Sequence, residues 1–144
     1  MTQAAATGAS NRLKQSHPIF LVKDVVKSAE YYRDVLGFRF DRYWGEPPCF
    51  CIVWRDAVEI FLKQPECPEQ AAIQPNGSGG AWDAYINVDS ADALFEELRA
   101  KGATIVREPD DTVYEMREFE VRDPDGHLLC FAHDISRKPG HVAD

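Results

Sequence analysis

One pattern of strand and helix signals occurs twice along the chain, and this repetition restricts the possible folds more than any other feature. In the first half, an apolar stretch ends at Asp24, and apolar residues then recur every three or four positions until Gly37. In the second half, a similar stretch ends at Ser90, and the same spacing continues to Gly102. Aspartate and serine are favoured helix N-caps, and glycine commonly ends a helix. The repeat therefore predicts two copies of a unit that begins with a strand and a helix.

Each predicted helix is followed by three stretches with strand character, separated by turn residues. The helices are expected at 25–36 and 91–101, and the Asp-Pro-Asp-Gly sequence at 123–126 is a strong turn signal. The expected strands are 17–23, 38–44, 50–54 and 57–63 in the first copy, and 82–88, 104–107, 117–122 and 128–133 in the second. The predicted fold class is α+β, with two tandem βαβββ modules forming a curved, partly closed mixed sheet.

The 144 residues can bury one substantial core but are few for two independent cores, so a single domain is expected. Polar, glycine-rich and proline-rich stretches set its boundaries. We expect a lead-in at 1–15, a single domain at 16–134 and a tail at 135–144. Within the domain, module one covers 16–64, a linker covers 65–80, and module two covers 81–134.

Charge and hydropathy argue against several classes of function. The formal net charge is −8, which would repel a nucleic acid backbone. The apolar runs are far shorter than the roughly 20 residues that cross a bilayer, and the N-terminus lacks the apolar segment of a secretory signal. We therefore expect no nucleic acid partner, no membrane association and a cytoplasmic location, where the four cysteines would stay reduced.

Alternation along the predicted strands places carboxylates and aromatic rings on the face opposite the helices. In the strand at 57–63, for example, Ile60 and Leu62 would point to the core while Glu59 and Phe61 point away. The same reasoning in the second module directs these residues away from the core: Asp83, Tyr85, Asn87, Glu118 and Glu120. A concave sheet that encloses a small molecule accounts for this composition better than a solvated sheet does.

Three stretches carry a resemblance to a known family: Ser28–Phe38, Ala57–Leu62 and Met116–His127, the last containing the Asp-Pro-Asp-Gly turn. Together they resemble the vicinal oxygen chelate superfamily, which includes glyoxalase I, bleomycin resistance proteins, fosfomycin resistance proteins and extradiol dioxygenases. The resemblance covers about 16–134 and implies the two-module fold. It does not separate the members by activity.

In the metal-using members, four side chains from the two modules hold one divalent ion. The resemblance places His17, Glu59, Asp83 and Cys130 at these positions. His17 and Glu59 are familiar ligands there, whereas a thiol at Cys130 would replace a hard carboxylate by a soft ligand. The leading expectation is therefore no cofactor. The alternative is a lyase, isomerase or dioxygenase that uses zinc, nickel, manganese or iron at His17 and Glu59.

The leading functional hypothesis is a small-molecule-binding protein that sequesters an aromatic or cationic ligand in a concave groove. Stacking surfaces would come from Trp44, Phe61, Trp82 and Tyr85, and polar or charged contacts from Glu59, Asp83 and Glu118. By resemblance to the drug-binding members, a homodimer is expected. A metabolite sensor that uses the same groove fits the sequence equally well.

Overall fold

The computed structural model describes residues 11–71 and 81–136. The described part of the chain contains both predicted modules. Most of the predicted lead-in and tail, and the second half of the predicted linker, lie outside the described residues. None of the helices in 11–71 or 81–136 is both long enough and apolar enough to span a membrane.

Module one forms a four-stranded sheet with the order β1-β4-β3-β2. Its elements are β1 (Ile19–Leu21), α1 (Val25–Asp34), β2 (Tyr43–Trp44), β3 (Phe50–Arg55) and β4 (Val58–Lys63), followed by the short 3₁₀ helix η2 (Pro68–Ala71). β1 runs parallel to β4, and the other neighbours are antiparallel. The parallel pair requires a crossover, which α1 supplies.

Module two repeats this topology with the order β5-β8-β7-β6. Its elements are β5 (Ala84–Asn87), α2 (Ala91–Ala100), β6 (Thr104–Asp111), β7 (Met116–Arg122) and β8 (Leu128–Asp134). β5 is parallel to β8, and the remaining pairs are antiparallel. The predicted fold class of two βαβββ modules is confirmed. Within the described ranges the two sheets remain separate, because no strand ladder joins them.

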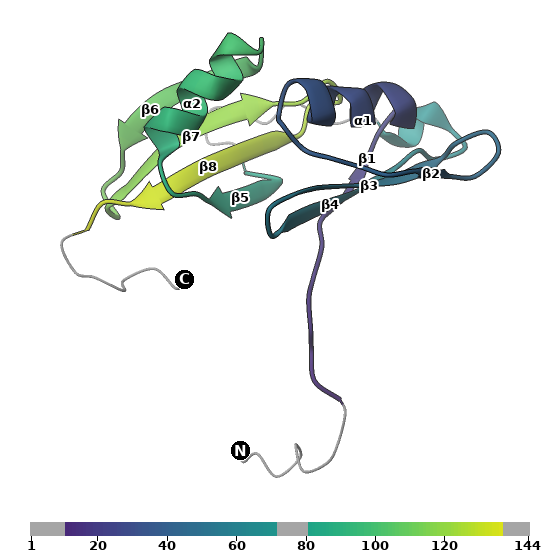
Figure 1. The fold of residues 1–144 in the computed structure, drawn as a ribbon, viewed down its shortest axis with the longest axis horizontal. Helices are drawn as coiled ribbons and strands as arrows, with labels where there is room; N and C mark the ends of the chain where they lie inside the picture. The colour runs from purple at the N-terminus through teal and green to yellow at the C-terminus, as the bar shows by residue number, and fades with distance from the viewer. Residues whose placement is uncertain (1–10, 72–80, 137–144) are drawn as a thin grey trace.

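Both helices begin at the predicted capping residues. The side chain of Asp24 accepts hydrogen bonds from the amides of Val26 and Lys27 at 3.1 Å each, and Ser90 Oγ accepts one from Ala93 at 3.1 Å. These bonds satisfy amide groups that have no partner within the helix. Figure 1 places α1 and α2 on the same side of the sheets, so the opposite face of each sheet, which we call the face without helices, carries neither α1 nor α2.

The predicted strand at 38–44 is wrong over most of its length. Only Tyr43 and Trp44 form a strand, and Arg39 makes an isolated bridge to Trp54. The segment 38–44 therefore pairs with β3 at Arg39 and again at Tyr43–Trp44, and it is unpaired between these positions. The intervening residues include Asp41 and Arg42, which are exposed and have no ladder partner on β3.

In the described part of the chain, side chains connect the two modules at the turn between β7 and β8 and at the end of β3. The turn packs on module one: Tyr32 donates a hydrogen bond to Asp123, and His127 stacks on Phe20 with ring centroids 4.1 Å apart. At the end of β3, Arg55 binds Glu97 of α2 through two hydrogen bonds of 2.9 and 3.0 Å. These contacts take the place of a shared strand ladder.

Candidate ligand-binding face

A cavity of about 480 Å³ lies where the two modules meet on the face without helices. Its walls come from residues 15–18, from 57–60 around the start of β4, and from 83–87 around β5. Four predicted site residues line it together: His17, Glu59, Asp83 and Tyr85. Two of them come from each module, so the cavity depends on the packing of one module against the other.

His17 and Glu59 contact each other at the module-one wall of this cavity. His17 Nδ1 lies 3.2 Å from Glu59 Oε1, and both side chains are partly exposed. The imidazole ring also stacks on Phe61, with centroids 4.8 Å apart and planes inclined by 19°. The pair therefore presents a polar edge to the cavity and an aromatic surface beside it.

The carboxylate of Asp83 has a structural partner. Its Oδ2 accepts a hydrogen bond of 2.8 Å from the amide of Leu128, and its own amide donates one of 2.8 Å to the carbonyl of Leu128. This pair of bonds fixes the start of β8 beside β5. Asp83 is therefore a wall residue of the cavity, with one carboxylate oxygen engaged by the backbone.

Glu118 is fully buried, although it lies on the sheet face without helices. Its Oε2 accepts hydrogen bonds from the hydroxyls of Tyr85 and Tyr114 at 2.8 and 2.7 Å, and its Oε1 accepts one of 2.7 Å from Arg107. A solvated Glu118 is thus ruled out. Tyr114 and Arg107 belong to this cluster, and neither was among the predicted site residues.

Glu120 extends the same cluster toward the second large aromatic residue. Its Oε2 accepts hydrogen bonds from the indole N–H of Trp82 at 3.1 Å and from Arg107 at 3.1 and 3.2 Å. Trp82 contacts Tyr85, with ring centroids 4.8 Å apart, and the two residues keep 39% and 37% of their surface exposed. The buried Glu118 and the partly exposed Glu120 therefore hold two exposed aromatic rings in place. We call Trp82, Tyr85, Tyr114, Arg107, Glu118 and Glu120 the aromatic cluster.

The electrostatic character of the aromatic cluster follows from where its protons are. Both tyrosine hydroxyls donate to Glu118, so the lone pairs of their oxygens remain to accept hydrogen bonds. Burial and the charge of Glu118 raise the pKa of Tyr114 to about 12 and raise the pKa of Tyr85 as well. Two carboxylates oppose one guanidinium, which leaves the cluster with an excess negative charge.

Cys130 occupies the fourth position that the family resemblance assigns to a metal ligand. It is fully buried and lies opposite Glu120 in the ladder between β7 and β8. Burial, reinforced by the charges of Glu118 and Glu120, raises the pKa of the thiol, which disfavours the thiolate that a metal would require.

The donor atoms do not form one coordination sphere. Asp83 Oδ2 is engaged by a backbone amide, and the hydrogen-bond or ion-pair contact among the four side chains is the one between His17 Nδ1 and Glu59 Oε1. Among residues 11–71 and 81–136, no group of three or more histidine, cysteine, aspartate or glutamate side chains could hold a metal ion. The four family positions therefore do not fit a four-ligand metal site in this arrangement.

Trp44 is separated from the cavity. It lies on β2, the edge strand at the end of its sheet away from β1, and it does not line the cavity. Its ring packs edge-on against Phe50, and the guanidinium of Arg42 lies 4.5 Å from its centroid. Phe50 in turn contacts Phe61, so Trp44 is connected to His17 only through a row of aromatic side chains.

Comparisons with known proteins agree with this architecture. The sequence pattern of the Glyoxalase/Bleomycin resistance protein/Dioxygenase superfamily matches residues 14–131. No curated protein matches the chain. A glyoxalase/bleomycin resistance protein/dioxygenase from Nocardioides is similar in structure, with a TM-score of 0.66, 21% identity, and coverage of 94% of this chain and 93% of the other.

Two further solved structures share the fold. The bleomycin-binding protein of Streptomyces verticillus, crystallised with copper(II)-bleomycin, has a TM-score of 0.62 and 23% identity, and the match covers 88% of this chain and 98% of that one. TioX from Micromonospora sp. ML1 has a TM-score of 0.65 and 21% identity, with coverage of 83% and 99%. At these identities the likeness establishes the fold alone.

Proposed function

Because the chain belongs to the Glyoxalase/Bleomycin resistance protein/Dioxygenase superfamily, we propose that it is a small-molecule-binding protein that sequesters a cationic aromatic ligand on the face without helices. The ligand would stack on Trp82 and Tyr85 and extend into the cavity lined by His17 and Glu59. Binding would need no catalytic metal.

The buried Glu118 is the observation that carries this proposal. A carboxylate removed from water is costly unless its partners compensate, and here two tyrosines and one arginine do so. The outcome is a pair of exposed rings with fixed orientation above a negative charge. A cation over an aromatic face gains about 0.5 to 2 kcal/mol, and a nearby buried carboxylate adds to the attraction.

The hydrogen-bonding pattern further narrows the ligand. Since the hydroxyl protons of Tyr85 and Tyr114 and the indole proton of Trp82 are all donated to carboxylates, the cluster offers acceptors and π faces at these three residues. A planar aromatic cation that carries N–H groups can donate to these acceptors and stack on these π faces. A carboxylate or phosphate ligand would face excess negative charge.

A homodimer is part of the same proposal. The rings of Trp82, Tyr85 and Tyr114 form an exposed aromatic surface, and a second copy that covers this surface would bury it and enclose the ligand. Light scattering at micromolar concentration is expected to give twice the 16.3 kDa mass of the chain. A monomeric mass at all concentrations tested would contradict shared binding sites.

Fluorescence titration with proflavine, a planar aromatic cation, tests the ligand class. We expect saturable quenching of tryptophan emission, and about tenfold weaker binding in Trp82→Phe and Tyr85→Phe. Glu118→Gln should weaken binding similarly. Glu108→Gln is the matched control, because Glu108 is an exposed carboxylate in module two with no hydrogen bond to another described residue. Unchanged affinity in all three cluster variants, with circular dichroism showing intact folds, would refute the proposal.

A second candidate is divalent-metal chemistry centred on His17 and Glu59, because their 3.2 Å contact places an imidazole and a carboxylate at one cavity wall. This reading predicts that the metal content of the purified protein depends on both side chains. Proflavine binding that persists in Glu59→Gln, combined with no metal requirement, would favour sequestration.

A further inference from the structure

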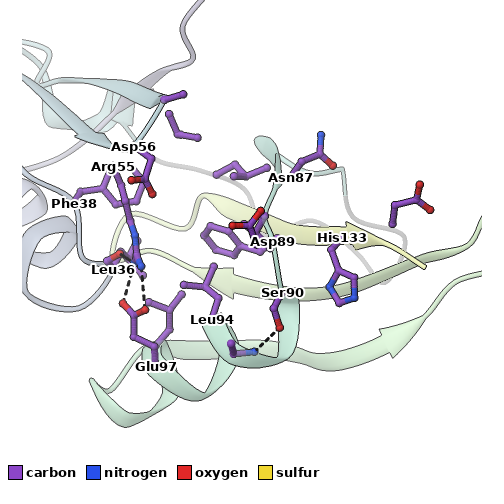
Figure 2. A pocket seen from close by; sticks show the side chains of 18 residues that line it. Leu36, Phe38, Arg55, Asp56, Asn87, Asp89, Ser90, Leu94, Glu97 and His133 are labelled. Atoms are coloured by element: carbon purple, nitrogen blue, oxygen red, sulfur yellow. Dashed lines mark hydrogen bonds and ion pairs between the residues drawn. The ribbon is translucent and has the colours of Figure 1, made fainter. Parts of the chain in front are cut away.

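A second and larger cavity lies on the helix side of the junction between the modules. Its volume is about 820 Å³, within the range of small-molecule sites. Figure 2 shows that its lining comes from both modules: Leu36 and Phe38 follow α1, Arg55 ends β3, and Leu94 and Glu97 lie on α2. We call this cavity the helix-side cleft. None of the residues proposed above to contact the cationic aromatic ligand lines it.

The apolar part of the helix-side cleft is aliphatic where it is accessible. Phe38 and Phe131 line it but are each only 4% exposed, so their ring faces are not available for stacking. The partly exposed apolar lining consists of Val58, Val88 and Leu94. A flexible aliphatic body fits such a lining, whereas the opposite face of the protein offers exposed rings.

The charged part of the cleft is predominantly acidic. Four carboxylates line it, from Asp56, Asp89, Glu97 and Asp134, against the single guanidinium of Arg55. Arg55 is already neutralised by its two hydrogen bonds to Glu97 and also donates to the carbonyl of Leu36 at 2.9 Å. The excess charge of the cleft is therefore negative.

Within the described ranges, two of these carboxylates form no ion pair, although after the hydrogen bonds to Glu97 the charge of Asp56 also contributes to the raised pKa of Arg55. Asp56 and Asp89 are exposed, and neither forms a hydrogen bond or salt bridge with another described residue. Asp56 belongs to module one and Asp89 to module two, and in Figure 2 Asp89 lies between the Arg55–Glu97 pair and His133. A cation that enters the cleft would meet carboxylates from both modules.

His133 does not offset this charge. Its Nδ1 accepts a 2.8 Å hydrogen bond from the amide of Ala91, the first residue of α2. An imidazole nitrogen that accepts a hydrogen bond carries no proton, so the ring is neutral with its proton on Nε2. A charged imidazolium at this helix N-terminus would also oppose the helix dipole.

From these observations we infer that the helix-side cleft is a second binding site, and that its ligand is a small amphipathic amine with an aliphatic body. The ammonium group lies against Asp56 and Asp89, and the aliphatic chain lies on Val58, Val88 and Leu94. Aliphatic chemistry separates this ligand from the aromatic cation proposed for the other face.

The two cavities share one wall. Ala57, Val58, Ile86 and Asn87 line both the helix-side cleft and the cavity at His17. No strand ladder joins the sheets at this junction among the described residues. A ligand in the helix-side cleft would therefore contact residues that also form a wall of the cavity at His17.

Nuclear magnetic resonance titration of the full chain with octylammonium chloride tests the inference. Saturable amide shifts are expected at Asp56, Asp89 and Leu94. 1-Octanol, with the same alkyl chain and no charge, should bind at least fivefold more weakly, and octanoate should cause no saturable shifts. Asp56→Asn with Asp89→Asn should weaken octylammonium binding at least fivefold. Asparagine tolerates the positive φ of 52° at position 56, so the fold should persist.

The double variant Asp41→Asn with Glu108→Gln is the matched control, because it removes two exposed charges outside the cleft. It should bind octylammonium as the parent does. Shifts confined to the strands around Trp82, an equal response to octanoate, or unchanged affinity in the aspartate double variant would overturn the inference. Because the probe and the variants differ from those of the proflavine experiment, either proposal can fail while the other stands.

Discussion

The hydroxyl of Tyr32 donates a 2.7 Å hydrogen bond to Asp123 Oδ2, and this bond links α1 of module one to the turn between β7 and β8 of module two. Asp123 also accepts hydrogen bonds from the amides of Asp125 and His127, and its carboxylate lies 2.9 Å from His127 Nδ1. These bonds stabilise the turn, and through Tyr32 the turn connects module two to module one. Burial and the charge of Asp123 raise the pKa of Tyr32 well above its usual value, so the hydroxyl keeps its proton at neutral pH.

Replacing Tyr32 by phenylalanine should therefore destabilise the fold. The variant keeps the ring but removes one donor from a buried carboxylate, which costs about 1.5 to 3 kcal/mol for a hydrogen bond to a charged group. Chemical denaturation followed by circular dichroism measures the free energy of unfolding. Tyr43→Phe is the matched control, because the Tyr43 hydroxyl makes no hydrogen bond to another described residue, and a change within about 0.5 kcal/mol is expected there. Equal effects would show that the Asp123 contact contributes nothing.

Two glycines at equivalent positions of the repeat provide a second comparison. Gly37 and Gly102 follow the two helices with φ of 78° and 90°, a region that alanine adopts only with strain. A Cβ at Gly102 would meet nothing within 4 Å, whereas a Cβ at Gly37 would lie 2.6 Å from Arg55 Nη1. Gly37→Ala therefore has to displace the guanidinium that binds Glu97.

We expect Gly102→Ala to cost about 1 kcal/mol from backbone strain alone. Gly37→Ala should cost at least about 1 kcal/mol more, because it also disturbs the hydrogen bonds of Arg55 to Leu36 and Glu97. Thermal and urea unfolding of the two variants provide the comparison. A smaller loss for Gly37→Ala than for Gly102→Ala would mean that the Arg55–Glu97 bridge does not help to hold the modules together.

The parts of the fold that the sequence predicts well depend on neighbours close in the chain. The caps at Asp24 and Ser90 involve amides two or three residues away, and the assignment of Glu59 and Phe61 to one face depends only on the alternation of a strand. The expected strand at 104–107 continues to Asp111, past Pro109. Proline is tolerated there because β6 is an edge strand.

The parts that sequence reasoning misses depend on register between distant strands and on packing of one module against the other. A register shift between Ile105 and Arg107 places Arg107 opposite Glu120 in the β6–β7 ladder, where it also reaches Glu118, and no local pattern encodes this shift. His127 directly follows the predicted turn at 123–126, yet it is 3% exposed and stacks on Phe20 of the other module. Alternation predicts on which face Glu118 lies, but not that two tyrosines cover it.

Thiol reactivity should separate the four cysteines into two pairs. Cys49 and Cys67 are exposed, whereas Cys51 and Cys130 are buried. Burial raises the pKa of Cys51 to about 11 and also raises the pKa of Cys130. Only about one thiol in a thousand with a pKa of 11 is ionised at pH 8, and the thiolate is the reactive form. Ellman's reagent at pH 8 should therefore react rapidly with two thiols in the native protein and with four in guanidinium chloride.

The double variant Cys49→Ser with Cys67→Ser should lack the rapid phase. After unfolding, its two remaining thiols, Cys51 and Cys130, should both react. Rapid reaction of Cys130 in the native double variant would indicate that its thiol is accessible and readily ionised. Such a result would restore Cys130 as a candidate metal ligand, since metal binding requires the thiolate.

Metal content distinguishes sequestration from metal-dependent catalysis most directly. Protein purified without chelator should carry well under one equivalent of any transition metal in elemental analysis, because Asp83 Oδ2 is hydrogen-bonded to a backbone amide and the pKa of Cys130 is raised. Added zinc, nickel, manganese or iron(II) should leave the melting temperature unchanged. A tight metal site would be detected in this experiment, since a ligand at a hundred times its dissociation constant stabilises the native state by about 2.7 kcal/mol.

Near-stoichiometric metal that disappears in both His17→Ala and Glu59→Gln would overturn the sequestration proposal, because the 3.2 Å contact between these side chains would then be part of a metal site. Metal that disappears only when Cys49 and Cys67 are replaced would reflect binding to exposed thiols and leave the proposal intact.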